Sequence, residues 1–382
     1  MNAYITDLAA FLPNAPVDNR SMENILGRIG GAPSRTRSII LRRNRILQRY
    51  YAIDPATGRL THTNAQLTAE AVRRLKPYAG FTPADIECLA CGTSSPDQLL
   101  PGHGMMVHGE LSGTPCEVVT TSGICLSGIG ALKYAAMNVA LGLVGNAVAT
   151  GSELASTFTW AGMFQDVSPG SETALDPRPT LAFQADFLRW MLSDGAGAAF
   201  LSWTPPAERP ALRIDWIDHL SYANELETCM YSGAVKNADG SLTGWRSFDS
   251  LREAVAANAF LLQQDVNLLN REIIKTAVDR ALSRVIARHG IVPADVDWFL
   301  PHYSSDFFRE PLRRRMEGIG FSIPPGRWFS NLATKGNTGS ASIFILLEEL
   351  FHSGRLRKGE RLLCMIPESG RFSMAYMLLT VV

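Results

Sequence analysis

Cys125 is the residue whose type and setting best suit nucleophilic catalysis in this chain. It follows a strand expected over residues 116–121 and lies at the first turn of a helix expected over residues 125–141. A helix N-terminus carries partial positive charge and free N–H groups, which favour a thiolate and can stabilise an oxyanion. The neighbouring Gly123 and Gly128 leave room for a thin substrate. The alternative is a buried structural cysteine, which is common in such proteins.

Two polar residues are the candidate partners of Cys125. His302 follows a strand expected over residues 296–300, and strand ends are where catalytic residues gather in α/β proteins. Asn337 lies in a turn that opens a helix expected over residues 340–351. Asparagine is also an ordinary capping and turn residue, so neither position alone establishes a function.

The other five cysteines lack a spacing that indicates chemistry. Cys88 and Cys91 fall three apart on an expected strand, where they point to opposite faces and suit neither a shared metal nor a disulfide. Cys116, Cys229 and Cys364 have no partner nearby in sequence. A serine hydrolase is disfavoured as well, because no Gly-x-Ser-x-Gly motif occurs.

Short strands alternate with longer helices along the chain, which predicts an α/β protein. The helix after Cys125 and its following strand recur after Asn337, at an offset of about 213 residues. A proline-rich connector, residues 203–210, lies between the repeats. The sequence therefore predicts two duplicated halves, residues 1–205 and residues 206–382. One or two further helices are expected over residues 255–288.

The overall composition limits the classes of partner. The 36 basic and 36 acidic residues balance, which argues against a dedicated nucleic-acid binder. The N-terminus does not resemble a signal peptide, and no apolar run approaches the roughly 18 residues of a membrane span. A cytoplasmic protein is the expectation.

Six motifs occur in the order and approximate spacing of type III 3-oxoacyl-acyl-carrier-protein synthases, and this resemblance spans nearly the whole chain. They are Ser122–Gly128, Gly151–Glu153, Asp194–Ala198, Pro301–His302, Gly336–Thr338 and Ser369–Gly370. The resemblance implies an α/β, thiolase-like, five-layer α-β-α-β-α fold and a homodimer. It implies that the protein holds neither a metal nor a bound cofactor. It also implies that the substrates are acyl-CoA or acyl-carrier-protein thioesters.

The resemblance also implies a role for each site residue. As an acyltransferase of class EC 2.3.1, the chain would take an acyl group onto Cys125, with the N–H groups of Cys125 and Gly370 as the oxyanion hole. His302 and Asn337 would bind the carbonyl of a malonyl- or 3-oxoacyl-thioester. Their hydrogen bonds would stabilise the enolate that attacks the acyl group in a Claisen condensation.

Some positions depart from the usual pattern of these synthases. Ser305 stands where they carry an asparagine that contacts the pantetheine arm, and extra sequence falls around residues 156–188 and 216–256. These departures suggest a specialised branch of lipid or polyketide biosynthesis, such as one that makes dialkylresorcinol-like lipids. Two alternatives stay open. One is an acyltransferase that passes the acyl group to an alcohol or amine, and the other is a non-catalytic partner subunit.

Two further features have a functional and a structural interpretation. Glu153 is either an accessory base near the cysteine or part of a structural turn. Two groups of arginines suit an acidic carrier protein or the phosphates of coenzyme A, or form ordinary solvated faces. The first group is Arg35, Arg37, Arg42, Arg43, Arg45 and Arg49, and the second, which follows the histidine directly, is Arg309, Arg313, Arg314 and Arg315.

Overall fold

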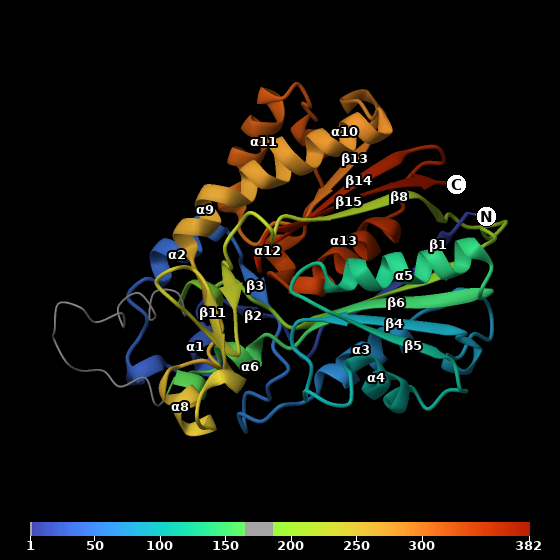
Figure 1. Ribbon diagram of the computed structural model, residues 1–382. Helices are drawn as coiled ribbons and strands as arrows, with labels where there is room; N and C mark the ends of the chain where they lie inside the picture. The colour runs from blue at the N-terminus through green and yellow to red at the C-terminus, as the bar shows by residue number, and fades with distance from the viewer. Residues whose placement is uncertain (1, 165–185) are drawn as a thin grey trace.

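A computed structural model describes residues 2–164 and 186–382, and its main feature is one mixed β-sheet (Figure 1). Within these residues the nine strands lie in the order β13-β14-β15-β8-β1-β7-β6-β4-β5. Their bounds are β1 Tyr4–Phe11, β4 Cys88–Thr93, β5 Glu117–Ser122, β6 Asn146–Glu153, β7 Gly195–Ser202, β8 Leu212–Ser221, β13 Trp298–Pro301, β14 Arg361–Glu368 and β15 Ser373–Val381.

The sheet consists of two parts with matching topology. In the first part β1 and β7 pair antiparallel, as do β7 and β6, whereas β6 and β4 pair parallel. In the second part β8 and β15, then β15 and β14, pair antiparallel, and β14 and β13 pair parallel. Among the described residues, the strands of the two parts pair with each other through β1 and β8, at Tyr4 and Ile5. The connector between β7 and β8 spans residues 203–211.

Helices form three layers around the two parts of the sheet, as Figure 1 shows. Two central helices lie between the parts, α3 and α4 cover the outside of the first, and α9, α10 and α11 cover the outside of the second. This arrangement confirms the expected five-layer α/β fold. The bounds are α3 Asn64–Arg73, α4 His103–Leu111, α5 Ser127–Leu141, α9 Val266–Lys275, α10 Ser283–His289, α11 Arg309–Gly318 and α13 Ser342–Phe351, with α5 and α13 central.

Glycines allow the central helices to approach the sheet and each other closely. A Cβ atom on Gly151 of β6 would lie 2.3 Å from the backbone oxygen of Ser340, and one on Gly128 of α5 would lie 2.7 Å from the same oxygen. Any larger residue would force the two halves apart at this point. These glycines belong to the motifs that surround the cysteine, so the motif spacing reflects packing as well as chemistry.

Short elements gather beside one end of the sheet, on the left in Figure 1. They are α1 Met22–Leu26, α2 Arg37–Asn44, α6 Ser156–Thr159, α8 Leu251–Ala256, α12 Leu332–Lys335, β2 Val17–Asp18, β3 Gln48–Arg49, β9 Met230–Tyr231, β10 Ala234–Lys236, β11 Leu242–Gly244 and β12 Gln263–Gln264. Extra sequence was expected around residues 156–188 and 216–256. In the first of these segments, residues 165–185 lie outside the described residues. The other begins later than expected, because residues 216–221 belong to β8.

The prediction of one or two helices over residues 255–288 is wrong for the first part of this segment, before α9. Helix α8 ends at Ala256, and Asn258 adopts a positive φ of 58° that interrupts the helix. Strand β12 then pairs with β9, and the Asp265 side chain caps α9 by accepting the N–H of Leu268. A π-helical segment, Thr276–Leu282, joins α9 to α10. Among the described residues, no helix has both the length and the apolar character that crossing a bilayer requires.

The two edges of the main sheet differ. Along β5, in the described part of the chain, the only strand partner is β4. At the other edge, the segment after α11 lies along β13, where the N–H of Phe329 donates to the carbonyl of Phe299 at 2.9 Å and Trp328 forms a bridge with Phe299. The edge at β5 is therefore open, whereas the edge at β13 is partly covered.

Candidate active site

Cys125, His302, Asn337 and Gly370 all line one cavity of about 380 Å³. The first half contributes Cys125, which lies between β5 and α5. The second half contributes His302 after β13, Asn337 before α13, and Gly370 in the turn between β14 and β15. The fold thus brings both halves to one site.

Cys125 lies just before the helix and not within its first turn, because α5 begins at Ser127. The cysteine is buried, with 9% of its surface exposed. The N–H groups of its two neighbours, Ile124 and Leu126, donate to the carboxylate of Glu368 at 3.0 and 3.1 Å. Within the described residues the N–H of Cys125 itself has no acceptor in another residue, which leaves it available to a substrate oxygen.

The expected lowering of the cysteine pKa is wrong for this structure. Burial, reinforced by the charges of Glu368 and Glu153, raises the pKa of Cys125 well above its usual value. The positive end of α5 is offset by the Glu368 carboxylate, which occupies the N–H groups on either side. The thiol form is therefore favoured before a substrate binds.

His302 is a buried histidine whose main chain continues the strand pairing. Its N–H donates to the carbonyl of Met365 on β14 at 2.8 Å, which fixes the residue at the carboxyl end of β13. Burial lowers the pKa of His302 to about 4, so the imidazole is neutral at physiological pH. A neutral imidazole can donate one hydrogen bond to an oxygen without delivering a proton to a carbanion.

Asn337 is held by its main chain and by its side-chain oxygen. Its N–H donates to the carbonyl of Met191 at 3.0 Å, and its own carbonyl accepts the N–H of Ser193 at 2.9 Å. The Oδ1 atom accepts the N–H of Gly339 at 3.1 Å, which leaves the Nδ2 group as the donor for a ligand. The preceding Gly336 has φ +72°, and a Cβ there would lie 2.8 Å from the Cβ of Ser193, so this turn requires glycine.

Glu153 also borders the cavity, but its oxygens are occupied by hydrogen bonds. It accepts the N–H (3.2 Å) and hydroxyl (2.6 Å) of Ser94, the hydroxyl of Ser95 (2.9 Å) and the N–H of Ser340 (3.1 Å). The two serines belong to the first half and Ser340 to the second. These contacts favour the structural interpretation, in which Glu153 joins the halves beneath the cysteine.

Ser305, the proposed accessory residue, lies at the start of a short turn after His302. Its hydroxyl accepts the N–H of Phe307 at 3.3 Å and caps a short 3₁₀ turn, and it is buried. Its neighbours Tyr303 and Ser304 line the cavity instead.

The cavity wall is mainly apolar and draws on two separate hydrophobic clusters. One cluster contributes Ala155, Leu188, Met191, Leu192 and Met230. The other contributes Leu269, Ile273, Ala277, Tyr303, Phe308, Leu312 and Met365. The polar groups of the site thus lie between two apolar surfaces, an arrangement that suits a thioester carrying an apolar chain.

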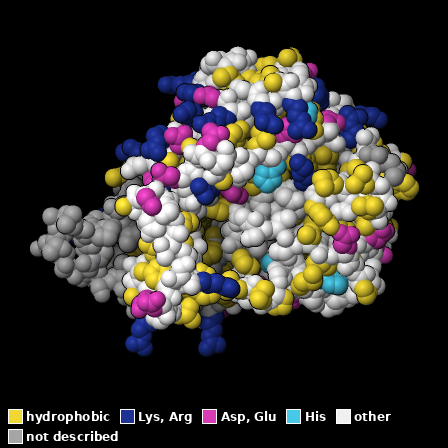
Figure 2. All heavy atoms as spheres, viewed as in Figure 1, with side chains coloured by type: hydrophobic (Ala, Val, Ile, Leu, Met, Phe, Trp, Pro, Cys, Tyr) yellow, Lys and Arg dark blue, Asp and Glu magenta, His cyan; other side chains and the backbone are white. Residues whose placement is uncertain are grey.

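The two arginine groups, separate in sequence, meet around one surface hollow. It is lined by Arg42, Arg43, Arg45, Asp306, Phe307, Arg309, Glu310, Arg313, Pro325 and Trp328. Figure 2 shows basic side chains gathered over the upper elements, α9 to α11.

Many of these arginines are already paired. Glu310 binds Arg313 at 2.6 Å and Arg314 at 2.7 Å, Arg315 pairs with Asp279, and Arg45 lies 3.3 Å from Asp306. Arg49 is fully buried and Arg37 pairs with Glu23. Among the described residues, Arg42, Arg43 and Arg309 around the hollow form no ion pair with a carboxylate.

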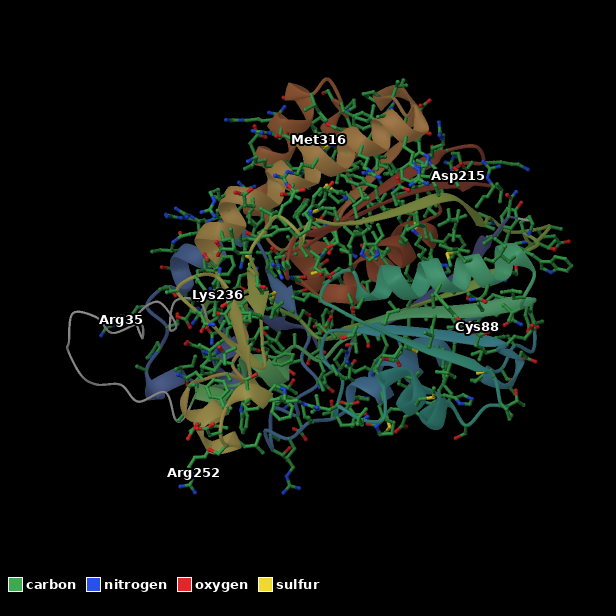
Figure 3. All side chains as sticks on the ribbon, viewed as in Figure 1. Arg35, Cys88, Asp215, Lys236, Arg252 and Met316 are labelled. Atoms are coloured by element: carbon green, nitrogen blue, oxygen red, sulfur yellow. The ribbon has the colours of Figure 1, made fainter. Side chains whose placement is uncertain are left out.

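Cys88 and Cys91 are structural, as expected. Both are fully buried on β4, where Figure 3 labels Cys88 in the lower sheet. Burial raises the pKa of each to about 12, so neither is a ready nucleophile. All six cysteines are free.

Glu368 is the residue of the site that sequence reasoning missed. It ends the apolar strand β14 and lies two residues before Gly370. A single acidic residue at the end of a buried strand was the available signal, since such carboxylates are costly unless they accept hydrogen bonds. Its partners lie more than 240 residues away in sequence, at Ile124 and Leu126.

Comparison with known proteins agrees with this fold. Residues 286–378 match the family model described as 3-oxoacyl-[acyl-carrier-protein (ACP)] synthase III C terminal. A beta-ketoacyl-[acyl-carrier-protein] synthase III of Allorhizobium ampelinum is 24% identical over 95% of this chain and 94% of the relative.

Solved structures extend the likeness to the whole fold. FabH, the 3-oxoacyl-(acyl carrier protein) synthase III of Pseudomonas aeruginosa, superimposes with a TM-score of 0.70 at 20% identity, covering 100% of this chain and 98% of that one. A variant of OleA from Xanthomonas campestris, solved with bound lauric acid and lauroyl-CoA, gives 0.74 at 19% identity, with coverages of 100% and 99%. The chain therefore has a thiolase-like fold, and over most of its length it is similar to acyltransferases of the ketoacyl synthase III type.

Proposed function

We propose that the chain carries out a Claisen condensation in which Cys125 holds the acyl group and His302 with Asn337 activates the second thioester. The observation that supports this most strongly is the shared cavity, in which a cysteine with a free N–H lies with a neutral imidazole and an oriented amide. Cysteine supplies the nucleophile, and the other two groups supply hydrogen bonds without a ready proton.

The first half-reaction forms the acyl-enzyme. The Cys125 sulfur, once deprotonated, attacks the thioester carbonyl, and the N–H groups of Cys125 and Gly370 bind the resulting oxyanion. The donor thiol then leaves with a proton, and a new thioester joins the acyl group to Cys125. The Gly370 turn is positioned for this by its own carbonyl, which accepts the N–H groups of Cys229 (2.8 Å) and Met230 (3.2 Å).

The second half-reaction forms the carbon–carbon bond. When a malonyl thioester loses carbon dioxide, the electron pair of the broken bond moves onto the thioester carbonyl as an enolate. His302 and Asn337 Nδ2 stabilise that oxygen, and the enolate carbon attacks the acyl group on Cys125. Cys125 leaves as a thiolate, and the product is a 3-oxoacyl thioester. A 3-oxoacyl thioester as second substrate would instead lose a proton to solvent from the carbon between its two carbonyls, and the resulting enolate would bind the same two donors.

The apolar wall supports an acyl chain as the substrate of the first half-reaction. Side chains from two clusters border the polar centre, with Leu188 and Met191 on one side and Leu269 and Ile273 on the other. Burial of an apolar chain contributes about 0.8 kcal/mol per methylene. We therefore place the substrates among fatty acyl or polyketide thioesters. A dialkylresorcinol-like lipid is one product that condensation of such thioesters gives.

Intact-protein mass spectrometry after incubation with a panel of acyl thioesters, followed by a malonyl or 3-oxoacyl thioester chase, tests this function. We expect an acyl adduct on the protein, which the chase converts to an extended product. An adduct that only an alcohol or amine discharges would support the acyltransferase alternative. Absence of any adduct across the panel would support the non-catalytic subunit.

We also propose that the halves, residues 1–205 and 206–382, arose by duplication and that two copies associate through β5. The matching strand orders of the two parts support the duplication. The open edge of β5 supports the homodimer, because an unpaired strand edge is a template for another strand. The exposed side chains of Leu99 and Leu100, on the loop after β4, add apolar surface.

The hollow around Arg42, Arg43 and Arg309 is the proposed contact for an acidic carrier protein or for coenzyme A phosphates. It lies beside α11, which follows the His302 loop, so a carrier bound there is close to the cavity. Arg313, Arg314 and Arg315 are weaker candidates than expected, since carboxylates already neutralise them.

Replacing both Arg42 and Arg43 with glutamate should raise the KM for a carrier-linked donor by about tenfold, which corresponds to about 1.4 kcal/mol of lost attraction. Loading from an acyl-pantetheine, which has neither phosphates nor protein, should stay unchanged. Steady-state loading rates at two salt concentrations measure this, with Arg357→Glu as an exposed control at a distant site. Equal KM values for wild type and the double variant would contradict the proposed contact.

A further inference from the structure

Glu368 occupies the junction between the two segments that supply the oxyanion hole. Its Oε2 atom accepts the N–H groups of Ile124 (3.0 Å) and Leu126 (3.1 Å), the residues on either side of Cys125. The N–H between them is the one that would bind the substrate oxygen. Glu368 thus takes the two flanking donors and leaves the central donor free.

The same carboxyl group also contacts the Gly370 turn. A Cβ on Gly370 would lie 3.3 Å from Oε1 of Glu368, and one on Gly123 would lie 3.4 Å from Oε2. The carboxyl therefore fills the space between the cysteine loop and the glycine turn. Ser369, between Glu368 and Gly370, is held separately by the Nε2 group of Gln264 at 3.0 Å.

We propose that Glu368 is a positioning residue for the oxyanion hole, which holds the Cys125 loop against the Gly370 turn so that their N–H groups converge on one oxygen. The inference rests on the proposed function, because it assumes that a thioester is attacked at Cys125. A single acceptor that bonds both neighbours of Cys125 fixes the direction of the peptide unit between them. Hydrogen bonds from backbone donors to a carboxylate are strong enough to do so.

The charge of Glu368 works against the chemistry that its geometry supports. A carboxylate near Cys125 disfavours the thiolate, and Glu368 is among the groups that raise the pKa of this thiol. Positioning needs only an acceptor oxygen, which an amide also provides. Glutamine and alanine at position 368 both remove the charge, but only glutamine keeps an acceptor oxygen, so only alanine should disturb the oxyanion hole.

Two reactions of Cys125 separate these effects. Alkylation by iodoacetamide needs the thiolate alone, whereas acylation by octanoyl-CoA also needs the oxyanion hole. Glu368→Ala should lower acylation at least tenfold more than alkylation, since loss of an oxyanion donor costs about 10²–10³-fold. Glu368→Gln should keep the wild-type ratio of the two rates and shift the pH profile of alkylation toward lower pH.

Glu360→Ala is the matched control. Glu360 precedes the other end of β14 and its carboxylate also accepts a backbone N–H, from Arg357 at 2.9 Å, and the indole N–H of Trp298 at 2.9 Å. Its loss should leave the ratio of acylation to alkylation unchanged. If Glu368→Ala does not fold, Glu368→Asp replaces it. Its side chain is one methylene shorter, so acylation should again fall more than alkylation.

Three outcomes would overturn the inference. If the ratio of acylation rate to alkylation rate in Glu368→Ala equals that of the wild type, the carboxylate does not position the donors. An equal loss in Glu368→Gln and Glu368→Ala would show that charge or packing, and not an acceptor oxygen, is what matters. Wild-type protein that is alkylated at Cys125 but takes an acyl group from no thioester would overturn the proposed function and the positioning role together.

Discussion

Replacing Cys125 with alanine should abolish formation of the acyl-enzyme, which is the largest single effect expected in this chain. Cys125 is the cysteine that lines the cavity, whereas Cys88, Cys91 and Cys364 are fully buried in the core. Without the sulfur no thioester bond can form, so intact-protein mass spectra should show no acyl adduct at any donor concentration. The fold should survive, because the change removes one sulfur atom from a cavity wall.

Cys116→Ala is the control for this result. Cys116 precedes the edge strand β5 and is partly exposed, so it is another thiol that a thioester can reach. This variant should load as the wild type does. An adduct that persists in Cys125→Ala and disappears in Cys116→Ala would reassign the nucleophile.

His302→Ala and Asn337→Ala should each slow condensation about 10²–10³-fold, the usual cost of removing one donor to a developing oxyanion. Loading of Cys125 should change much less, because that step uses backbone donors. Single-turnover experiments with pre-loaded enzyme measure condensation apart from loading. Because the pKa of His302 is lowered to about 4, protonation of this imidazole should not reduce condensation between about pH 7 and pH 5.

His352→Ala is a suitable control, since His352 is exposed on the helix end after α13 and far from the cavity lining. Both half-reactions should keep their wild-type rates in this variant. Parallel losses of loading and condensation in His302→Ala or Asn337→Ala would contradict separate roles for the two donors and the nucleophile.

The α/β class and the repeat were predictable from local signals in the sequence, whereas the five-layer arrangement was implied by the resemblance to the synthases. A glycine-rich turn, a small-residue helix and an apolar strand occur after Cys125 and again after Asn337, and each signal involves neighbours in sequence. The same signals locate His302 at a strand end. They predict which residues reach the carboxyl ends of strands, where the cavity lies.

Features that depend on distant contacts were not predictable. The raised pKa of Cys125 arises from its burial and from Glu368 and Glu153, which only folding brings near it. The arginine groups are each plausible anion sites in sequence, but pairing with Glu310 and Asp279 neutralises several of them. The break in the helix expected over residues 255–288 arises because β12 pairs with β9, a contact that helical periodicity does not reveal.

The unequal edges of the main sheet limit how far copies of the chain can add to one another. Association through β5 about a twofold axis would consume the edge that is open in the described residues, and the segment at Trp328 and Phe329 lies along the opposite edge. Growth would therefore terminate at a closed pair, whereas a sheet with two open edges can propagate into a fibre. In such a pair, the partly covered edge at β13 would disfavour the addition of further strands.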